Sequence, residues 1–481
     1  MPMLSGAHNL TANNSTFVDQ STKLVNNTSH NAQITINSNH ERTGLRILLA
    51  ASTPEASHDS SARYPPPRCH PGTRTEYIQR LTQWGLNVDN HTDSIVWVKG
   101  PAGTGKSAIA QSYAEALGEK LGATFFFSRP NKRDNPNRFF TSISHQLAVN
   151  FDPYGDLLDR KITHNPTLVK KAIPHQFSDL IVTPIHQLKL EGKEFPERVI
   201  IVDGLDECAD AGAQVDIVKI IAESARTQST PFLWVFFSRL EPNILAVFDS
   251  PEVKLISLPI VLEVSREIDG DIALYLTDKL LETAQKHSLA LPWPRESEIW
   301  VLVDYSNGLF ACAHAISHFI DDRNSAGPAE QLCAVLDLAK YSTQNASNHP
   351  LSGLNSFYTL VMERIPSTQL QTVQWILLAT RMPRILDAVD NANLLRLSEL
   401  QFRNACRYLH SVMTVPDDEE PRINFYHASF MDFLEDPARS RQFCIWSGCA
   451  VALFDELLPR FDHISVTCDS GEYRPGTCPI P

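Results

Sequence analysis

One short segment limits the fold of this chain more than any other feature. Residues 100–107 read Gly-Pro-Ala-Gly-Thr-Gly-Lys-Ser and match the pattern GxxxxGK[ST]. An apolar run at residues 95–98 precedes them, and a segment of helical spacing follows, whose buried face would be Ile109, Ala110, Tyr113, Ala114 and Leu117. A strand, a glycine-rich loop and a helix in this order predict a phosphate-binding loop (P-loop) in an α/β fold.

The residues of this loop suit contact with a nucleotide. Glycines allow successive backbone N–H groups to point at phosphate oxygens, and the helix N-terminus adds a positive partial charge. Lys106 can reach the β- and γ-phosphates, and the Ser107 hydroxyl is placed to bind Mg²⁺. We therefore expect ATP or ADP, with Mg²⁺, to contact Gly100, Pro101, Ala102, Gly103, Thr104, Gly105, Lys106, Ser107 and Ala108.

An acidic box, Asp-Gly-Leu-Asp-Glu at residues 203–207, follows the apolar run at residues 199–202. Ligands of open parallel sheets bind at the carboxyl ends of the strands. Asp203 is therefore expected to hold Mg²⁺ through water, and Asp206 or Glu207 to orient and deprotonate an attacking water. The alternative for such an acid is a plain helix-capping aspartate.

Arg239 follows another apolar run, at residues 232–237. A guanidinium at the same sheet edge can sense a γ-phosphate and stabilise charge during its transfer, so we count Arg239 with Asp206 and Glu207 as candidate catalytic residues. The alternative is a surface arginine at a strand end.

The apolar pattern changes along the chain, from alternating strands and helices to helices alone. Short β-rich runs at residues 95–98, 123–127, 199–202, 232–237 and 253–258 alternate with helical segments, which predicts a parallel sheet covered by helices on both faces. From Arg266 to about Leu409 the spacing is helical. A capping box at residues 398–401, strands at 411–415 and 423–426, and a helix from Ser429 then predict a winged-helix-like unit.

These patterns give the expected domain organisation. We expect a disordered Asn/Ser/Thr-rich arm at 1–44, a linker and lead-in helix at 45–92, a P-loop nucleotide-binding domain at 93–262, a helical subdomain at 263–366, a winged-helix-like subdomain at 367–440 and a C-terminal tail at 441–481.

Composition excludes several classes of protein. The net charge of −13 disfavours bulk nucleic-acid binding, and the expected hairpin carries four consecutive acids at residues 417–420, although Arg403 and Arg407 lie on the helix before it. The nine cysteines form no CxxC pair, which favours a reducing compartment. No apolar run reaches about 18 residues. We expect a cytoplasmic protein that binds neither DNA nor membrane.

Three segments together carry a family resemblance. GPAGTGKSAIAQ at 100–111, VIIVDGLDEC at 199–208 and FFSR at 236–239 resemble the NACHT branch of the STAND P-loop ATPases, which are signalling switches related to NLR receptors. ARYPPPRCHPGTR at 62–74, SNGLFACAHAISHFI at 306–320 and FYHASFMDFLEDPARS at 425–440 resemble NACHT proteins of mushroom-forming fungi, often labelled nephrocystin-like. The resemblance covers roughly residues 45–440.

The resemblance implies further site residues. In NLR-type members a winged-helix histidine touches the β-phosphate of ADP, and His427 occupies that motif here. The linker before the P-loop contributes to the adenine pocket in this family, which implicates Thr73 and Arg74. Related domains often have Gly-x-Pro where this chain has Gly308, Leu309 and Phe310. The sequence therefore does not determine how the adenine side of the nucleotide pocket is closed.

The resemblance also implies a function. It predicts an ATP/ADP-dependent conformational switch with slow hydrolysis, in fungal non-self recognition or regulated cell death, with nucleotide-dependent self-association and further protein partners. Neither the repeat sensor nor the effector domain common in such proteins is visible, so we expect a switch module alone. The alternative from another class is a small-molecule kinase, which would share the P-loop, the Mg²⁺ and the sheet.

Overall fold

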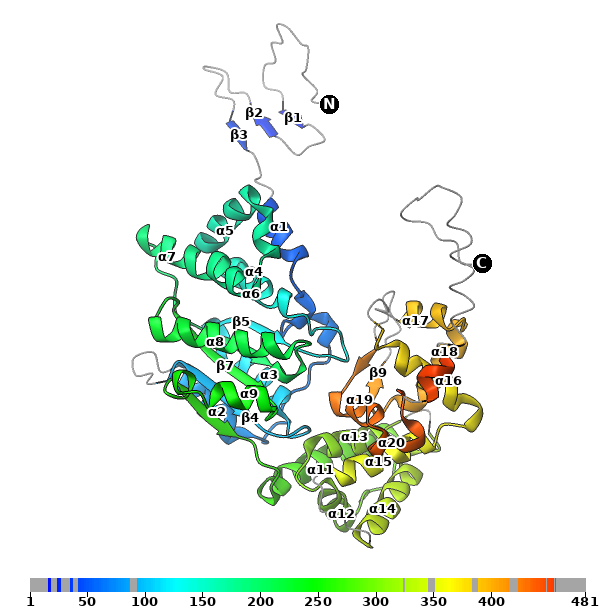
Figure 1. The fold of residues 1–481 in the computed structure, drawn as a ribbon. Coiled ribbons are helices and arrows are strands. Elements are labelled where there is room, and N and C mark those ends of the chain that lie inside the picture. Colours follow the sequence, from blue (N-terminus) through cyan, green and yellow to red (C-terminus); the bar gives the residue numbers. More distant parts are fainter. Residues whose placement is uncertain are drawn as a thin grey trace, which may run out of the picture.

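A five-stranded parallel sheet lies at the centre of the N-terminal half in the computed structural model (Figure 1). The structure describes residues 42–86, 93–322, 325–344, 351–382, 388–414, 423–446, 448–453 and 455, and the backbone of three short strands before residue 42. The strands of the parallel sheet, in spatial order, are β5 (Leu121–Phe126), β6 (Arg198–Asp203), β7 (Phe232–Ser238), β4 (Ile95–Lys99) and β8 (Ser257–Val261).

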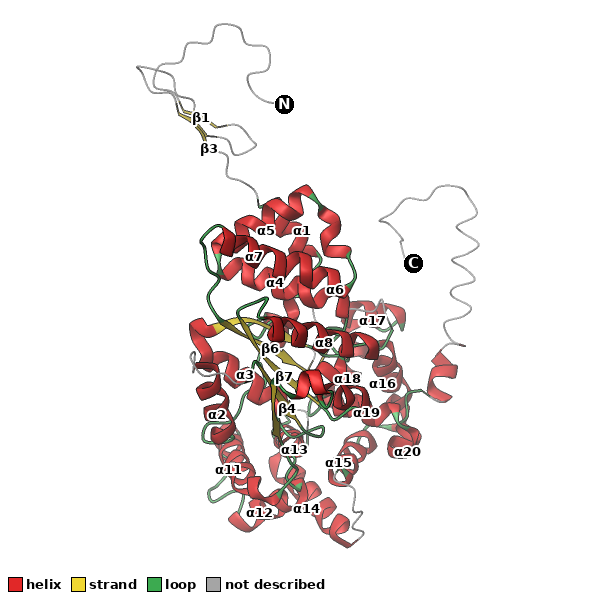
Figure 2. Ribbon diagram, turned by 60° about the vertical axis from the view of Figure 1, so that its left-hand side comes forward, coloured by secondary structure: helices red, strands yellow, loops and turns green. Residues whose placement is uncertain are grey.

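Helices cover both faces of this sheet, as Figure 2 shows, which confirms the expected fold class. Alternate strand residues enter two separate cores, because successive side chains of a strand point to opposite faces. Trp97, Phe125 and Trp234 belong to one core, and Val98 and Val235 belong to the other. The helices of this half are α2 (Thr75–Leu86), α3 (Lys106–Leu117), α4 (Phe139–Asn150), α5 (Asp152–His164), α6 (Ile173–Gln176), α7 (Thr183–Leu190), α8 (Ala211–Thr227), α9 (Pro242–Phe248) and α10 (Pro251–Lys254).

The last strand lies later in the sequence than its apolar pattern suggests. We expected a strand at residues 253–258, but α10 (Pro251–Lys254) occupies its first two residues and β8 runs over Ser257–Val261. Pro251 at the first helical turn favours a helix there, because its fixed φ suits that position. Pro259 lies within β8, which tolerates it as an edge strand paired only with β4.

The residues before the P-loop are more ordered than the expected linker. Helix α1 (Thr43–Ala50) packs on α4 and α5, with Leu45 and Leu48 buried in the core. A Cβ at Gly44 would lie 2.1 Å from the backbone oxygen of Asp159 in α5, so glycine permits this close contact. Helix α1 is therefore part of the sheet half, and the backbone N–H of Leu45 donates to Oδ1 of Asp159 at 3.0 Å.

Three short strands are described within the arm expected at residues 1–44, and most of that arm lies outside the described residues. Strands β1 (Thr16–Val18), β2 (Leu24–Asn26) and β3 (Thr35–Asn37) form an antiparallel sheet. Each strand contains a β-branched residue, and β-branched residues favour strands even in an Asn-rich segment.

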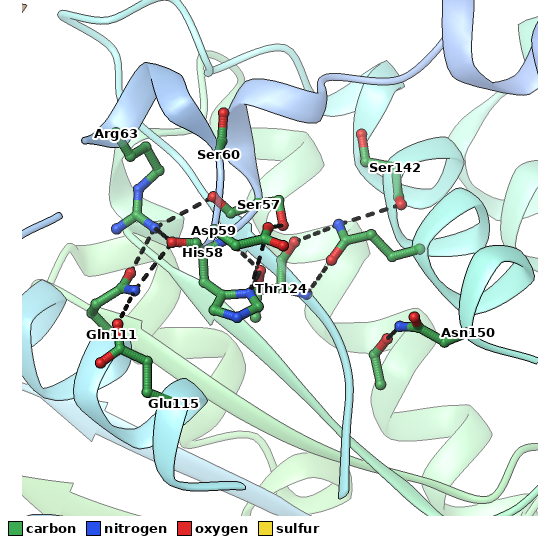
Figure 3. Close-up of polar contacts among 12 residues, drawn as sticks. Ser57, His58, Asp59, Ser60, Arg63, Gln111, Glu115, Thr124, Ser142 and Asn150 are labelled. Atoms are coloured by element: carbon green, nitrogen blue, oxygen red, sulfur yellow. Dashed lines mark hydrogen bonds and ion pairs between the residues drawn. The ribbon is translucent and has the colours of Figure 1, made fainter. Parts of the chain in front are cut away.

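Side chains cap the exposed edge of β5. The N–H of Thr124 donates to Oε1 of Gln146 at 2.9 Å, and Nε2 of Gln146 donates to the Thr124 carbonyl at 2.8 Å. His58 donates its backbone N–H to the Thr124 hydroxyl, and Asn150 bonds the Gly122 carbonyl (Figure 3). These contacts satisfy backbone groups that an edge strand leaves open for another strand.

The C-terminal half is helical and lies beside the sheet half (Figure 1). Its buried apolar residues, from Ile272 to Leu453, form one core. The capping box that we expected at Ser398 and Gln401 is confirmed. The helices are α11 (Asp269–Lys286), α12 (Glu296–Ser306), α13 (Phe310–Ile320), α14 (Pro328–Gln344), α15 (Ser352–Glu363), α16 (Ser367–Ala379), α17 (Ala388–Leu394), α18 (Glu399–Cys406), α19 (Ala428–Glu435) and α20 (Pro437–Ser440).

A short antiparallel pair, β9 (Met413–Thr414) and β10 (Asn424–Phe425), joins α18 to α19. The order of helices, hairpin and helix follows the sequence expectation, and Phe430, Phe433 and Leu434 are buried on α19 as expected. The acidic turn at residues 417–420 lies outside the described residues. Among the helices described, none combines the length and apolar character that crossing a membrane requires.

Candidate functional site

The P-loop links the carboxyl end of β4 to the N-terminus of α3. Gly103 and Gly105 have φ values of 82° and 91°, in the region that side chains disfavour, so glycine is required at both positions. Gly105 is the N-cap residue of α3, and the helix begins at Lys106. All five residues that the helical spacing placed on the buried face of α3 are buried. The loop and its helix thus have the form that phosphate binding needs.

Lys106 lies where the loop, the acidic box and Arg239 meet. Its Nζ donates to the carbonyls of Gly100 and Pro101, at 2.7 Å each, which leaves one of its three donors for a ligand. Burial lowers the pKa of Lys106 to about 8, while the charges of the box raise it and Arg239 lowers it. These residues therefore share one electrostatic environment.

Asp203 lies at the end of β6 and faces Ser107 of the P-loop helix. The Ser107 side chain hydrogen-bonds to Asp203, and the carboxylate oxygen Oδ1 is buried with no hydrogen-bond partner among the described residues. Burial raises the pKa of Asp203 to about 6. A hydroxyl beside an unsatisfied buried carboxylate fits Mg²⁺, which takes few protein ligands and completes its shell with waters and phosphates. No larger cluster of His, Cys, Asp or Glu suited to a metal occurs among the described residues.

Asp206 and Glu207, which the sequence left as alternatives for the same role, have different contacts in the structure. Asp206 accepts the backbone N–H of Arg239 at 2.9 Å on Oδ1, and its Oδ2 pairs with Nε of Arg239 at 3.1 Å. Glu207 accepts only a backbone N–H, that of Arg129, at 3.1 Å among the hydrogen bonds described. Burial and then the charge of Asp206 raise the pKa of Glu207 to about 8. Asp206 thus holds Arg239 in place, whereas Glu207 lines the cleft with a carboxyl group whose pKa is raised.

Arg129 is a site residue that the sequence analysis missed. Besides the backbone contact with Glu207, its Nη2 donates to the Asp206 carbonyl at 3.0 Å. The sequence pattern that indicated Arg239 also applies to Arg129. Arg129 follows the apolar run of β5 as Arg239 follows that of β7, and both strands end at the same sheet edge.

A polar cleft of about 240 Å³ separates the acidic box from α19 of the C-terminal half. Arg239 reaches across to Asp432 of α19, with 2.6 Å between Nη1 and Oδ2. The cleft thus joins candidate catalytic residues to the helical half. It is lined by Arg129, Pro130, Asp206, Glu207, Ala211, Gln214, Arg239, Glu241, Asn243, Arg381, Ala428, Met431, Asp432 and Glu435.

Arg74 contacts the P-loop from the segment before it. Its Nη2 donates to the Thr104 carbonyl at 2.9 Å, and its buried Nε and Nη1 have no hydrogen-bond partner. The guanidinium lies 5.1 Å from the ring centre of Phe310, the residue that stands in place of the family's proline. Thr73, by contrast, bonds the carbonyl of His70 within its own turn. Arg74 and Phe310 together therefore close this side of the loop.

The P-loop and His427 contact different residues of helix α13, and none of the contacts described joins them directly. Ala311 donates its backbone N–H to the Gly103 carbonyl at 3.1 Å, so the start of α13 touches the loop. His427, the N-cap residue of α19, meets His314 of α13 edge-on, with ring centres 5.2 Å apart. Its Nε2 is buried without a hydrogen-bond partner, and burial lowers its pKa to about 4. The imidazole is therefore neutral at pH 7.

Comparison with known proteins gives one family match. The model of the family described as Nephrocystin 3, N-terminal, matches residues 73–239, which span the P-loop, the acidic box and Arg239. That segment is nephrocystin-like. The match covers less than half of the chain. No curated protein matches the chain.

Solved structures resemble the chain only distantly. Cdc6p from Pyrobaculum aerophilum is 12% identical, with a TM-score of 0.36, covering 83% of this chain and 99% of its own. The Orc1 protein of Aeropyrum pernix, in complex with DNA, is 12% identical with a TM-score of 0.33, covering 79% and 94%. AMPPCP-bound DnaA from Aquifex aeolicus is 10% identical with a TM-score of 0.28, covering 74% and 92%.

Proposed function

We propose that the chain binds ATP and ADP with Mg²⁺ and hydrolyses ATP slowly as a conformational switch. The observation that carries this proposal is the pair of Ser107 and Asp203 beside Lys106, with the buried Asp203 Oδ1 unsatisfied. A buried acceptor without a partner costs free energy, so its retention is accounted for if a ligand completes it.

Each residue then has a distinct role. Lys106 and the loop N–H groups hold the β- and γ-phosphates, while Ser107 and Asp203 hold Mg²⁺, which would neutralise phosphate charge when bound. Glu207, in its ionised form, takes a proton from the attacking water, and its raised pKa makes that form a stronger base. Arg239 stabilises charge on the γ-phosphate, and Asp206 orients it.

The switch follows from contacts of the P-loop with the second half. Because Ala311 of α13 bonds the Gly103 carbonyl, a nucleotide in the loop would contact elements whose relative position it can bias. The family resemblance implies that His427 contacts the β-phosphate of ADP, and here its ring packs against His314 of α13. The domain boundaries proposed from the sequence place this nucleotide between residues 93–262 and the helical and winged-helix-like units at 263–366 and 367–440.

We assign the switch to the NACHT type of NLR-like proteins, acting in fungal non-self recognition or regulated cell death, with nucleotide-dependent self-association. The nephrocystin-like match at residues 73–239 and the motifs at residues 306–320 and 425–440 support this assignment.

Nucleotide binding by the full chain tests the proposal. A fluorescent ATP analogue titrated with Mg²⁺ should bind the wild type, and Lys106→Ala should weaken binding about a hundredfold, because a charge-assisted contact to phosphate is lost. Lys189→Ala, on the exposed side of α7, is the matched control and should bind as the wild type does. Equal affinities for wild type and Lys106→Ala would refute the P-loop assignment.

A further inference from the structure

Arg239 lies between two carboxylates that come from different halves of the molecule. Asp206 of the acidic box holds its Nε at 3.1 Å, and Asp432 of α19 holds its Nη1 at 2.6 Å. The Arg239 side chain is 24% exposed and that of Asp432 is 33% exposed, so the contact is partly shielded from water.

A second carboxylate on α19 faces the same cleft but serves a different partner. Glu435 pairs at 2.7 Å with Arg381, which follows α16 in the C-terminal half. The pair of Arg239 and Asp432 therefore crosses between the halves, whereas the pair of Arg381 and Glu435 stays within one. The loop after β5 adds neighbouring links across the halves, since Oδ1 of Asn131 accepts the Phe425 N–H at 3.2 Å and Lys132 bonds the Met382 carbonyl.

A carboxylate and a terminal phosphate present similar acceptors to a guanidinium. Asp206 fixes Arg239 at the sheet edge through both the backbone N–H and Nε, so the terminal nitrogens point away from the box. Arg239 also lies close enough to Lys106 to influence its charge. A phosphate of a nucleotide held by the P-loop would compete with Asp432 for the terminal N–H groups of Arg239, because both acceptors attract the same guanidinium.

We propose that Asp432 sets the discrimination between nucleoside triphosphate and diphosphate, by occupying on Arg239 the position that a γ-phosphate would take. The inference rests on the proposed function of the P-loop. A triphosphate must displace Asp432 from Arg239, whereas a diphosphate leaves the pair intact. Asp432 is thus a positioning residue that acts through Arg239, and its displacement releases α19 from the sheet edge.

Affinities of the full-length protein for the two nucleotides test this role. Asp432→Asn should bind the fluorescent ATP analogue about tenfold more tightly than wild type and ADP within about twofold, because only the triphosphate competes with Asp432. Glu435→Gln, which removes the other cleft carboxylate of α19, should leave both affinities unchanged. Asp432→Glu keeps the negative charge and should therefore keep the wild-type ratio of ATP affinity to ADP affinity.

A second measurement follows α19 itself. Amide hydrogen exchange of residues 428–435 in the wild type should be faster with a non-hydrolysable ATP analogue than with ADP, since the ion pair is broken only in the first case. Equal exchange with both nucleotides, or an equal change of both affinities in Asp432→Asn, overturns the role of Asp432 alone. A wild type that binds neither nucleotide overturns the proposed function and this inference with it.

Discussion

The two acids at the end of the box differ in their contacts, and this difference separates their roles. Asp206 is occupied by the backbone and side chain of Arg239, whereas Glu207 is held by one backbone N–H and has its pKa raised to about 8. The raised pKa makes the Glu207 carboxylate a stronger base than an ordinary glutamate, and only its ionised form, the minor one at pH 7, can accept the proton.

Glu207→Gln should therefore bind ATP within about twofold of wild type but hydrolyse it at least about a hundredfold more slowly, since only the base is lost. Phosphate release under single-turnover conditions measures the rate. Glu241→Gln changes another acid of the same cleft and should hydrolyse at the wild-type rate. Normal turnover in Glu207→Gln would show that this acid is structural.

The sequence predicted those site residues that follow apolar runs directly, because a strand and its sheet edge are local features. Asp203, Glu207 and Arg239 were proposed in this way, and all three lie close enough to Lys106 to shift its pKa. The pairing of Arg239 with Asp432 could not be predicted, since 193 residues separate them and no local pattern marks the contact. Arg129 could have been found by the rule that found Arg239.

At the scale of elements, three imidazoles lie between α13 and the hairpin that leads to α19. His314 lies 4.4 Å from His318 and 5.2 Å from His427 between ring centres, and Tyr426 contacts the first two. Burial lowers the pKa of all three, with nearby Lys279 of α11 lowering that of His314 and His318 further and Asp321 opposing it at His318. The packing of α13 against the hairpin and α19 therefore requires that these three imidazoles be neutral.

This cluster should make the fold acid-sensitive. The pKa of His427 is about 4 when folded against about 6.5 when unfolded, so its neutral form stabilises the fold above pH 6.5 and that stability is lost as the pH falls toward 4. We expect about 2 kcal/mol of stability to be lost between pH 7 and pH 5 through His427. Urea unfolding at the two pH values measures it. His427→Gln should lose less stability than the wild type between the two pH values. His164→Gln, at an exposed position, should lose as much stability as the wild type.

The edge of β5 is a second feature at this scale. Gln146 satisfies both backbone groups of Thr124, as a neighbouring strand would. Gln146→Ala should lower the free energy of unfolding by about 1–3 kcal/mol, because two backbone groups lose their partners, and should promote aggregation. Urea unfolding and light scattering test this. Gln187→Ala on the exposed surface of α7 should change stability by less than about 0.5 kcal/mol, and an equal loss in both variants would contradict the capping role.

At the scale of the molecule, polar contacts link the sheet half to the helical half at the site itself. Arg239 meets Asp432, Asn131 meets the hairpin at Phe425, and the start of α13 meets the P-loop at Gly103. Each of these contacts lies beside a residue that would bind nucleotide. The halves also have separate hydrophobic cores, so they can shift relative to one another without unpacking either core.

The state of the bound nucleotide should therefore change the shape of the molecule. With ADP, Arg239 keeps Asp432 and the halves stay together, whereas a non-hydrolysable ATP analogue draws Arg239 to the γ-phosphate and weakens the link. We expect the radius of gyration to rise by about 1–2 Å with the ATP analogue, together with more self-association. Small-angle scattering and gel filtration measure the two effects. Lys106→Ala should give the same scattering and elution profiles with either nucleotide, because it binds neither nucleotide tightly.

A wild type that binds both nucleotides with the same radius of gyration and the same elution volume would contradict the prediction. The contacts at Arg239, Asn131 and Gly103 would then fix the two halves permanently, and nucleotide binding would not be coupled to their arrangement.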